Sequence, residues 1–202
     1  MSKYSYMNVR EQMVETAREI WDRKLTNAAG GNFAVRVEPG KILITPSMMS
    51  EDKHGKLKPE DILLIDYDYH ILEGEGKLSR ETHMHVALLS TYEEIGATIH
   101  AHPFYCMPFV AFEKNIYSVT DATEGRGDIE CMEYAVPCSE QSVANVMSYF
   151  KEREEIVRRK PIGCIMPRHG VIVSGGDIHK AFSMLERIEA EAYCNIVRSF
   201  LK

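Results

Sequence analysis

The chain has 202 residues, of which 45% are hydrophobic and 27% are charged, and its formal net charge is −6. A chain of this length buries enough apolar surface to fold as one compact domain, and its composition excludes the disordered, collagen-like and coiled-coil classes. We therefore expect a single domain over residues 1–202.

Basic residues are dispersed along the chain except for one short run, Arg158, Arg159 and Lys160, which precedes Pro161. Cations interact favourably with the negative end of a helix dipole, so this run predicts a helix end, and we expect no nucleic-acid partner. The five cysteines include no CxxC pair, which predicts reduced thiols instead of a disulfide framework or a zinc knuckle.

Apolar residues are also distributed in a way that bears on location. The N-terminal segment has no apolar signal region, and no apolar stretch approaches the roughly 18 residues that span a bilayer. The sequence therefore predicts a cytoplasmic protein without a membrane partner.

The first third of the chain contains one helical pattern followed by several short β-rich runs. Apolar residues recur at three- and four-residue spacing between residues 8 and 25, which predicts a helix. The runs at 33–37 and 41–45 flank a Pro-Gly turn and predict a β-hairpin. A strand is expected at 61–66, followed by a turn and a weak returning strand within 67–76. These hairpins favour antiparallel pairing.

The rest of the chain alternates helical and β-rich segments. In order, we expect a helix at 82–92, a strand at 97–102, a helix at 104–113 kinked at Pro108, a helix at 139–155 capped by Ser139, a strand pair within 161–174 and a helix at 177–201. Because hairpins connect many of the strands, the fold class is α/β: a single layered α/β/α domain with a central mixed, mainly antiparallel sheet.

Two His-x-His pairs occur, His83 with His85 and His100 with His102. On a strand, residues i and i+2 share a face, so His100 and His102 project together. On a helix, residues two apart point about 200° away from each other, so the first pair does not chelate one ion easily. The second pair is therefore the candidate metal site, although an isolated His-x-His is more often two polar residues of a half-exposed strand.

His169 is the best candidate for a third ligand, because it lies between two apolar runs and Gly170 lets the backbone turn closely around a site. Three imidazoles with open coordination positions are typical of a catalytic site, not of a closed structural one. Such a donor set favours zinc, with manganese, cobalt, iron and nickel as alternatives.

Five motifs follow one another along the chain: Gly30-Gly31-Asn32, Thr45-Pro46-Ser47, Ser79-Arg80-Glu81 with His85 four residues on, His100-Ala101-His102-Pro103, and His169-Gly170. In this order and spacing the sequence resembles the class II aldolase/adducin family over most of its length. The resemblance implies that the three motif histidines bind a divalent metal. It also implies that Asn32, Ser47 and Ser79 contact the phosphate of a sugar substrate.

The same resemblance implies that Glu81 is the catalytic acid/base. The expected reaction is that of a metal-dependent lyase, which cleaves a small ketose phosphate to dihydroxyacetone phosphate and an aldehyde through a metal-stabilised enediolate. A decarboxylase of a sugar-acid phosphate, a 4-epimerase and a dehydratase of the same fold remain alternatives, as does a non-catalytic, adducin-like binding module. Family members commonly form fourfold-symmetric tetramers, so a homotetramer is expected by resemblance.

Several positions depart from the family pattern. Met48 stands where a glycine commonly follows the Thr-Pro segment, which bears on how closely a phosphate approaches the backbone. Arg80 replaces a second serine and is read either as a partner of a substrate phosphate or carboxylate, or as the ion-pair partner of a neighbouring acid. Arg126 lies in a Gly-rich loop; such loops often carry specificity, although a solvated loop is more common.

The second proton donor is a further departure. In the family, a C-terminal extension supplies a tyrosine, and no residue after the last expected helix takes its place here. Tyr105, Tyr117 and Asp121 follow the His-x-His strand and are alternatives among which the spacing does not choose.

Overall fold

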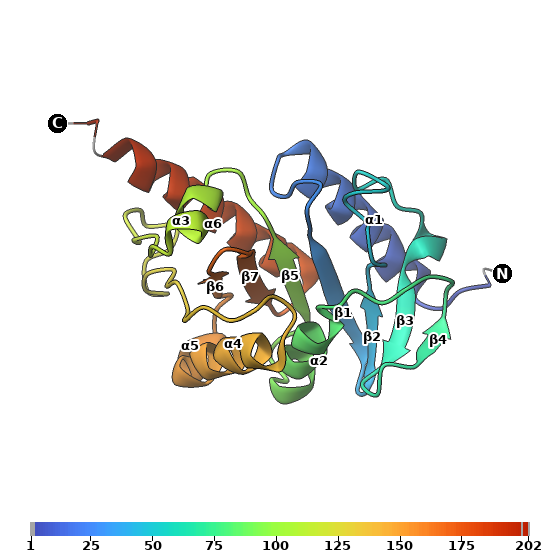
Figure 1. Cartoon of the computed structure of the whole chain (residues 1–202). Helices are drawn as coiled ribbons and strands as arrows, with labels where there is room; N and C mark the ends of the chain where they lie inside the picture. The colour runs from blue at the N-terminus through green and yellow to red at the C-terminus, as the bar shows by residue number, and fades with distance from the viewer. Residues whose placement is uncertain (1–2, 199, 202) are drawn as a thin grey trace.

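The computed structural model describes residues 3–198 and 200–201. The strands in this part of the chain are β1 (Asn32–Glu38), β2 (Lys41–Ile44), β3 (Leu63–Asp66), β4 (Ile71–Glu73), β5 (Ala97–Ala101), β6 (Gly163–Met166) and β7 (Gly170–Gly175). They form one sheet in the order β4-β3-β2-β1-β5-β7-β6, and every pair of neighbours is antiparallel (Figure 1). The parallel component of the predicted mixed sheet amounts to one isolated bridge between Cys131 and Ile165.

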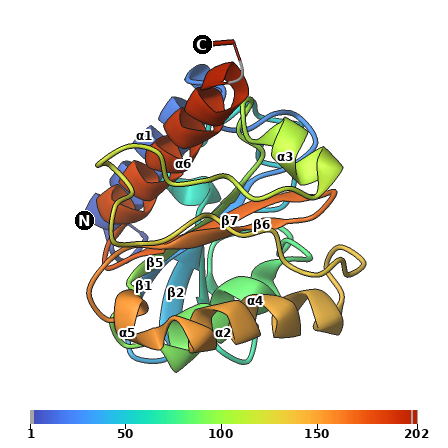
Figure 2. The ribbon, with the colours of Figure 1, turned by 90° about the vertical axis from the view of Figure 1, so that its left-hand side faces the viewer.

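Helices cover both faces of this sheet, which confirms the predicted α/β/α layers (Figure 2). The helices are α1 (Met7–Asp22), the short 3-10 helix η1 (Pro59–Asp61), α2 (Thr82–Thr91), α3 (Met107–Phe112), α4 (Glu140–Glu152), α5 (Glu154–Val157) and α6 (Ile178–Arg198). The pair α1 and α6 lies on one face, and α2, α4 and α5 lie on the other. None of the helices in the described ranges is long and apolar enough to cross a bilayer.

Two apolar cores lie between these layers, because successive side chains of a strand point to opposite faces. On β1, Phe33 packs in the core under α1 and α6, while Ala34 packs in the core over α2 and α4. On β5, Ile99 belongs to the first core. By the same alternation, the next residue, His100, points to the opposite face of the sheet, the face that α2 covers.

Most predicted elements are observed with shifted ends. The first helix ends at Asp22 and not near residue 25, and the last ends at Arg198, with residue 199 outside the described residues. The predicted kink at Pro108 is wrong, because this proline lies in the first turn of α3, where its missing N–H needs no partner. The predicted cap is confirmed: Ser139 Oγ accepts a hydrogen bond of 3.1 Å from the backbone N–H of Ser142.

The helix predicted at 139–155 is divided into α4 and α5 at Arg153, which has left the helical conformation. The Arg153 guanidinium lies 3.9 Å from the centroid of the Tyr149 ring and forms an ion pair with Glu130. The contact with Glu130, 23 residues away, is one that a local pattern does not reveal. The run Arg158 to Lys160 follows the end of α5 at Val157, as predicted.

Candidate functional site

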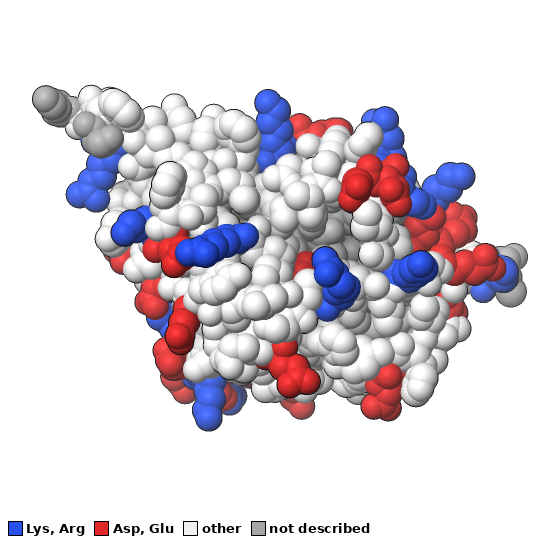
Figure 3. Space-filling view, in the orientation of Figure 1, with Lys and Arg blue, Asp and Glu red and all other residues white. Residues whose placement is uncertain are grey.

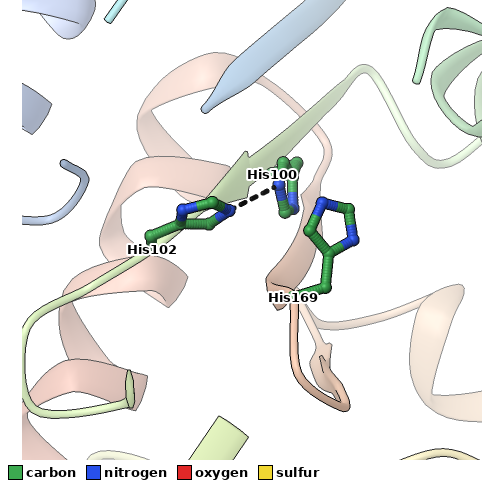
Figure 4. A group of neighbouring side chains, drawn as sticks. All are labelled: His100, His102 and His169. Carbon is green, nitrogen blue, oxygen red and sulfur yellow. Dashed lines mark hydrogen bonds between the residues drawn. The ribbon is translucent and has the colours of Figure 1, made fainter. Parts of the chain in front are cut away.

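The three predicted histidine ligands lie together at the end of β5 (Figure 4). His100 lies on β5, His102 follows the strand, and His169 lies in the turn between β6 and β7. The Nε2 atoms of His100 and His102 are 3.1 Å apart, and one ligand atom from each histidine lies within 4.8 Å of the others. The other pair diverges as predicted, because His83 is exposed and His85 is buried.

Hydrogen bonds fix how two of these imidazoles face the centre. His100 Nδ1–H donates to the carbonyl oxygen of Val171 at 2.9 Å, and His102 Nδ1–H donates to Asn27 Oδ1 at 3.3 Å. Both acceptors are oxygens without a proton, so the Nε2 lone pairs of both rings point inward. Burial holds the pKa of His100 well below its usual range and lowers the pKa of His102 to about 3. Two neutral rings therefore aim lone pairs at each other, an arrangement that a cation between them stabilises.

Glu81 completes this group from the N-terminal end of α2. Its carboxylate is buried; Oε2 lies 3.3 Å from His100 Nε2, and Oε1 lies 3.3 Å from His169 Nε2. Because the His100 ring is neutral, its contact with Glu81 is not an ion pair, and no lysine or arginine of the described residues pairs with Glu81.

Two polar atoms of this group have no hydrogen-bond partner among the described residues: Glu81 Oε1 and His169 Nδ1, which are both buried. A buried carboxylate without a compensating cation is costly. Three imidazoles beside one carboxylate form a donor set that a divalent transition metal satisfies. The residues present therefore fit a metal ion.

Two glycines let the backbone approach these rings. A Cβ atom on Gly30 would lie 2.5 Å from His102 Cε1, and one on Gly170 would lie 2.5 Å from the carbonyl oxygen of Ala101 and 2.9 Å from His100 Cε1. Neither position has room for a side chain. The prediction that Gly170 permits close approach around the site is confirmed.

Asn32 lies directly opposite His100 in the antiparallel pairing of β1 and β5. Its Nδ2 group donates hydrogen bonds to Glu81 Oε2 at 2.7 Å and to Ser79 Oγ at 3.2 Å. Its Oδ1 atom accepts a hydrogen bond of 2.5 Å from His85 Nε2. The amide is therefore engaged by protein groups at both ends and orients the Glu81 carboxylate, while the contact with phosphate expected of Asn32 stays a prediction.

His85, which belongs to the motif of Glu81, has a role in this site that the sequence pattern did not predict. It is fully buried, and burial lowers its pKa to about 4, so the ring is neutral near pH 7. Its Nε2–H donates to Asn32, and its Nδ1 accepts a hydrogen bond of 2.6 Å from the Thr98 hydroxyl. Thr98, His85, Asn32 and Glu81 thus form one continuous hydrogen-bonded chain. The available signal was the four-residue spacing from Glu81, which places His85 one helical turn along α2.

A cleft of about 280 Å³ opens beside Glu81 and His169. It is lined by the residues 28–32, 46–51, 79–81, 137, 138 and 169. The predicted phosphate-binding residues Ser47, Ser79 and Arg80 all lie in this lining, although Ser47 comes from the loop after β2 and the other two from the segment before α2. Arg80 is exposed and forms no ion pair with an acid of the described residues, so the structure gives no intramolecular partner for its guanidinium.

The loop after β2 contributes two further features to the cleft. Met48, where the resemblance led us to expect a glycine, has a φ of 64°, the left-handed conformation that glycine adopts at least cost. Ser50 Oγ is buried and has no hydrogen-bond partner among the described residues. Sequence reasoning missed Ser50, as it missed Asn27, because neither residue belongs to a recognisable motif.

The three alternatives for a second proton donor differ in whether they line a cleft near the candidate metal centre. Tyr105 lines a second cleft, and His102 also belongs to the lining of that cleft. Tyr117 and Asp121 line neither that cleft nor the cleft beside Glu81. Tyr117 is held elsewhere, since its backbone N–H donates to Asn195 Oδ1 on α6 at 3.1 Å.

The fold and the ligand set can be compared with known families. The model of the family described as "Class II Aldolase and Adducin N-terminal domain" matches residues 11–196 of the chain. This protein belongs to the class II aldolase and adducin family. The family recognised from the order of the five motifs is thus confirmed, as is the α/β fold class.

Relatives in the class II aldolase family carry more than one activity in their names. An L-fuculose phosphate aldolase of Methanococcus maripaludis is 30% identical over 192 residues, which cover 95% of this chain and 98% of that protein. A 3-oxo-tetronate 4-phosphate decarboxylase of Haemophilus influenzae is 28% identical, covering 91% of this chain and 84% of that protein. A solved L-fuculose 1-phosphate aldolase has a TM-score of 0.80 at 23% identity, covering 100% of this chain and 90% of its own, and shows the shared fold.

The class II aldolase family depends on a divalent metal, which agrees with the donor set of His100, His102 and His169.

Proposed function

We propose that the protein is a divalent-metal-dependent aldolase, which cleaves a small ketose phosphate to dihydroxyacetone phosphate and an aldehyde. One observation carries the proposal: two of the three clustered histidines, His100 and His169, lie 3.3 Å from the buried carboxylate of Glu81, at the wall of a cleft that also contains Ser47, Ser79 and Arg80. A structural metal site needs no such carboxylate beside an open cleft.

His100, His102 and His169 are the proposed ligands, and zinc is the proposed ion, with manganese, cobalt, iron and nickel as alternatives. When bound, the ion would supply Lewis-acid stabilisation of the negative charge that develops on an enediolate.

Glu81 is the proposed acid/base, and the hydrogen bonds of the site assign different tasks to its two oxygens. Oε2 accepts the hydrogen bond from Asn32, which fixes the plane of the carboxylate. Oε1 has no hydrogen-bond partner among the described residues, so it is the oxygen to which we assign the transferred proton. In this assignment, Oε1 takes up the proton that a substrate hydroxyl loses as the C–C bond breaks and the aldehyde forms. It then passes this proton to the enediolate carbon, which releases dihydroxyacetone phosphate.

Ser79 and Arg80 are the proposed anchors for the substrate phosphate. Ser79 Oγ accepts hydrogen bonds of 3.2 Å from both Asn32 Nδ2 and the backbone N–H of Glu81, so its own hydroxyl hydrogen is left to donate. The Arg80 guanidinium at the cleft mouth offers a fork of donors with the geometry that a phosphate accepts. The L-fuculose phosphate aldolase relative supports a phosphorylated sugar as the substrate class.

A decarboxylase of a sugar-acid phosphate is the second candidate. The same Arg80 is suited to a substrate carboxylate, and the Haemophilus influenzae relative is named for such a reaction. The retained histidines and Glu81 argue against an adducin-like binding module, and no feature of the cleft favours a 4-epimerase or a dehydratase over these two.

The test is a product assay on metal-loaded protein with ketose 1-phosphates, their unphosphorylated ketoses and 3-oxo-sugar-acid 4-phosphates. The proposal expects release of dihydroxyacetone phosphate, a fall in kcat of at least about 100-fold in Glu81→Gln with metal still bound, and a raised KM in Arg80→Gln. Release of carbon dioxide instead selects the decarboxylase. Full activity of Glu81→Gln contradicts the acid/base role.

A homotetramer, a cytoplasmic location and the absence of nucleic-acid partners stay predictions. Light scattering on the purified protein tests the first, because a tetramer has about four times the mass of the 23.0 kDa chain.

A further inference from the structure

Another cleft, distinct from the two described above, has a volume of about 570 Å³ and lies at the far end of β7 from the candidate metal centre. β7 begins at Gly170, beside the histidines, and ends at Gly175, which lines this cleft. The walls come from the loop around Arg126, from the segment after α5 and from the start of α6; Figure 2 shows α5 and the start of α6 on the same side of the molecule.

The cleft concentrates positive charge in a chain whose net charge is negative. Its lining contains six lysines and arginines and two acids, whereas the whole chain has a net charge of −6. The basic residues are Arg126, Arg158, Arg159, Lys160, Lys180 and Arg187. Arg158, Arg159 and Lys180 form ion pairs with Glu94, Glu154, Glu155 and Asp177, so the positive charge that no acid of the described residues pairs belongs to the other three. On the face seen in Figure 3, by contrast, basic and acidic side chains are interspersed. A cleft lined mainly by one sign of charge focuses its field and attracts ions of the opposite sign.

Two of these cations lie side by side without an acid. Arg126 Nη1 and Arg187 Nη1 both donate to the carbonyl oxygen of Ala122, at 3.2 Å and 2.6 Å. Both side chains are half-buried, and neither forms an ion pair with an acid of the described residues. Burial and the neighbouring Arg187 both lower the pKa of Arg126. Like charges held together in a partly dehydrated place repel, and an anion between them removes that repulsion.

A third cation approaches the same place from the segment after α5. The Lys160 ammonium lies against Gly125, where a Cβ atom would be only 2.7 Å from Nζ, and it too pairs with no acid of the described residues. The Gly-rich loop and the basic run, which are separate in the sequence, thus meet in one cleft.

We propose that this cleft binds a small phosphorylated molecule that carries at least two anionic groups, at a site separate from the candidate active site. Arginine forks recognise phosphate oxygens through paired, charge-assisted hydrogen bonds. The volume is in the range of small-molecule pockets and exceeds what one inorganic phosphate fills. The inference stands whether or not the proposed aldolase reaction is correct, because it uses none of the residues of that site.

The test is isothermal titration calorimetry on the full-length protein with three probes: inorganic phosphate, pyrophosphate and fructose 1,6-bisphosphate. The main variant is Arg126→Gln with Arg187→Gln. The matched control is Arg18→Gln with Lys56→Gln, which removes two exposed cations that do not line the cleft. Arg80→Gln shows whether a probe binds in the candidate active site instead. Lys160→Gln changes an exposed side chain of the proposed site and replaces the main variant if that variant does not fold.

We expect wild type, the matched control and Arg80→Gln to bind one of the two probes with two anionic groups at one equivalent per chain, more tightly than inorganic phosphate. The main variant should bind that probe at least tenfold more weakly, and Lys160→Gln several-fold more weakly. Absence of binding to both probes overturns the proposal. It is equally overturned if the main variant keeps its affinity, or if the binding is lost in Arg80→Gln instead.

Discussion

The Nδ2 group of Asn32 donates a hydrogen bond of 2.7 Å to Oε2 of Glu81, a residue 49 positions along the chain. The same asparagine is paired with His100 in the register of β1 and β5. One strand pairing therefore positions both a candidate metal ligand and the group that orients the candidate acid/base. Behind Asn32, the buried His85 holds the other end of the amide.

Replacing Asn32 by alanine separates orientation of Glu81 from metal binding. A lost hydrogen bond to a charged group costs about 1.5–3 kcal/mol, so we expect kcat to fall about 10- to 100-fold in Asn32→Ala. Because the hydrogen bonds of the Asn32 side chain go to Ser79, Glu81 and His85 and not to the three proposed ligands, the bound metal should stay at the wild-type level. Steady-state kinetics beside elemental analysis of the same sample measures both quantities.

Asn27→Ala is the matched control. For this variant we expect a loss of bound metal and, once metal is restored, an unchanged kcat. Asn27 Oδ1 accepts the hydrogen bond that orients the His102 ring, and loss of such a support typically lowers metal affinity about 10- to 100-fold. At saturating metal, kcat should recover. If Asn32→Ala loses metal while Asn27→Ala retains it, the roles assigned to the two asparagines are wrong.

Histidine 85 should make the stability of the fold depend on pH. Burial lowers the pKa of His85 from 6.5 to about 4. As the pH falls below about 6.5, the imidazole is therefore protonated in the unfolded chain while it stays neutral in the folded one. Stability is therefore lost as the pH falls from about 6.5 to 4, and the contribution between pH 7.5 and pH 5 is about 2 kcal/mol.

Urea unfolding of wild type and His85→Gln at these two pH values measures that contribution. The variant is expected to be less stable than wild type at pH 7.5, because it disturbs the bonds to Asn32 and Thr98. Its loss of stability towards pH 5 should nevertheless be smaller. Equal losses in the two proteins would show that His85 is not a source of the pH dependence.

The φ of 64° at Met48 gives a prediction about the loop that lines the cleft. The left-handed conformation costs a residue with a Cβ atom about 1–2 kcal/mol, whereas glycine adopts it freely but loses about 0.5–1 kcal/mol through unfolded-state entropy. Met48→Gly should therefore be more stable than Met48→Ala by up to about 1.5 kcal/mol. Thermal unfolding of the two variants checks this order, and a more stable alanine variant would contradict it.

Local patterns were sufficient for most of the elements and for the ligand pair. The period of two that predicts His100 and His102 on one face is visible in the sequence itself, and the structure brings the two rings together although β5 ends at Ala101, between them. The kink predicted at Pro108 failed because the effect of a proline depends on where the helix begins. At the break between α4 and α5, Arg153 contacts Tyr149, one helical turn before it, and Glu130, 23 residues away; only the second contact is outside the reach of a local pattern.

In the candidate site, too, some features could be predicted from the sequence and others depend on contacts between distant residues. The family resemblance directed attention to Glu81, Ser79 and Arg80, and the structure gathers them at one cleft. The link from His85 through Asn32 to Glu81 required the register of β1 against β5 and the packing of α2 on the sheet. Those are long-range relationships, and a single sequence does not encode them in any local pattern.

Elemental analysis of the purified protein is the most direct test that His100, His102 and His169 bind a divalent transition metal. The comparison uses wild type, His100→Ala and, as a matched control, His83→Ala, which removes an exposed histidine outside the group of three. We predict close to one equivalent of metal per chain in wild type and in His83→Ala, and a loss of most of it in His100→Ala. An absence of transition metal from wild type, or an unchanged metal content in His100→Ala, would contradict the metal centre on which the proposed function depends.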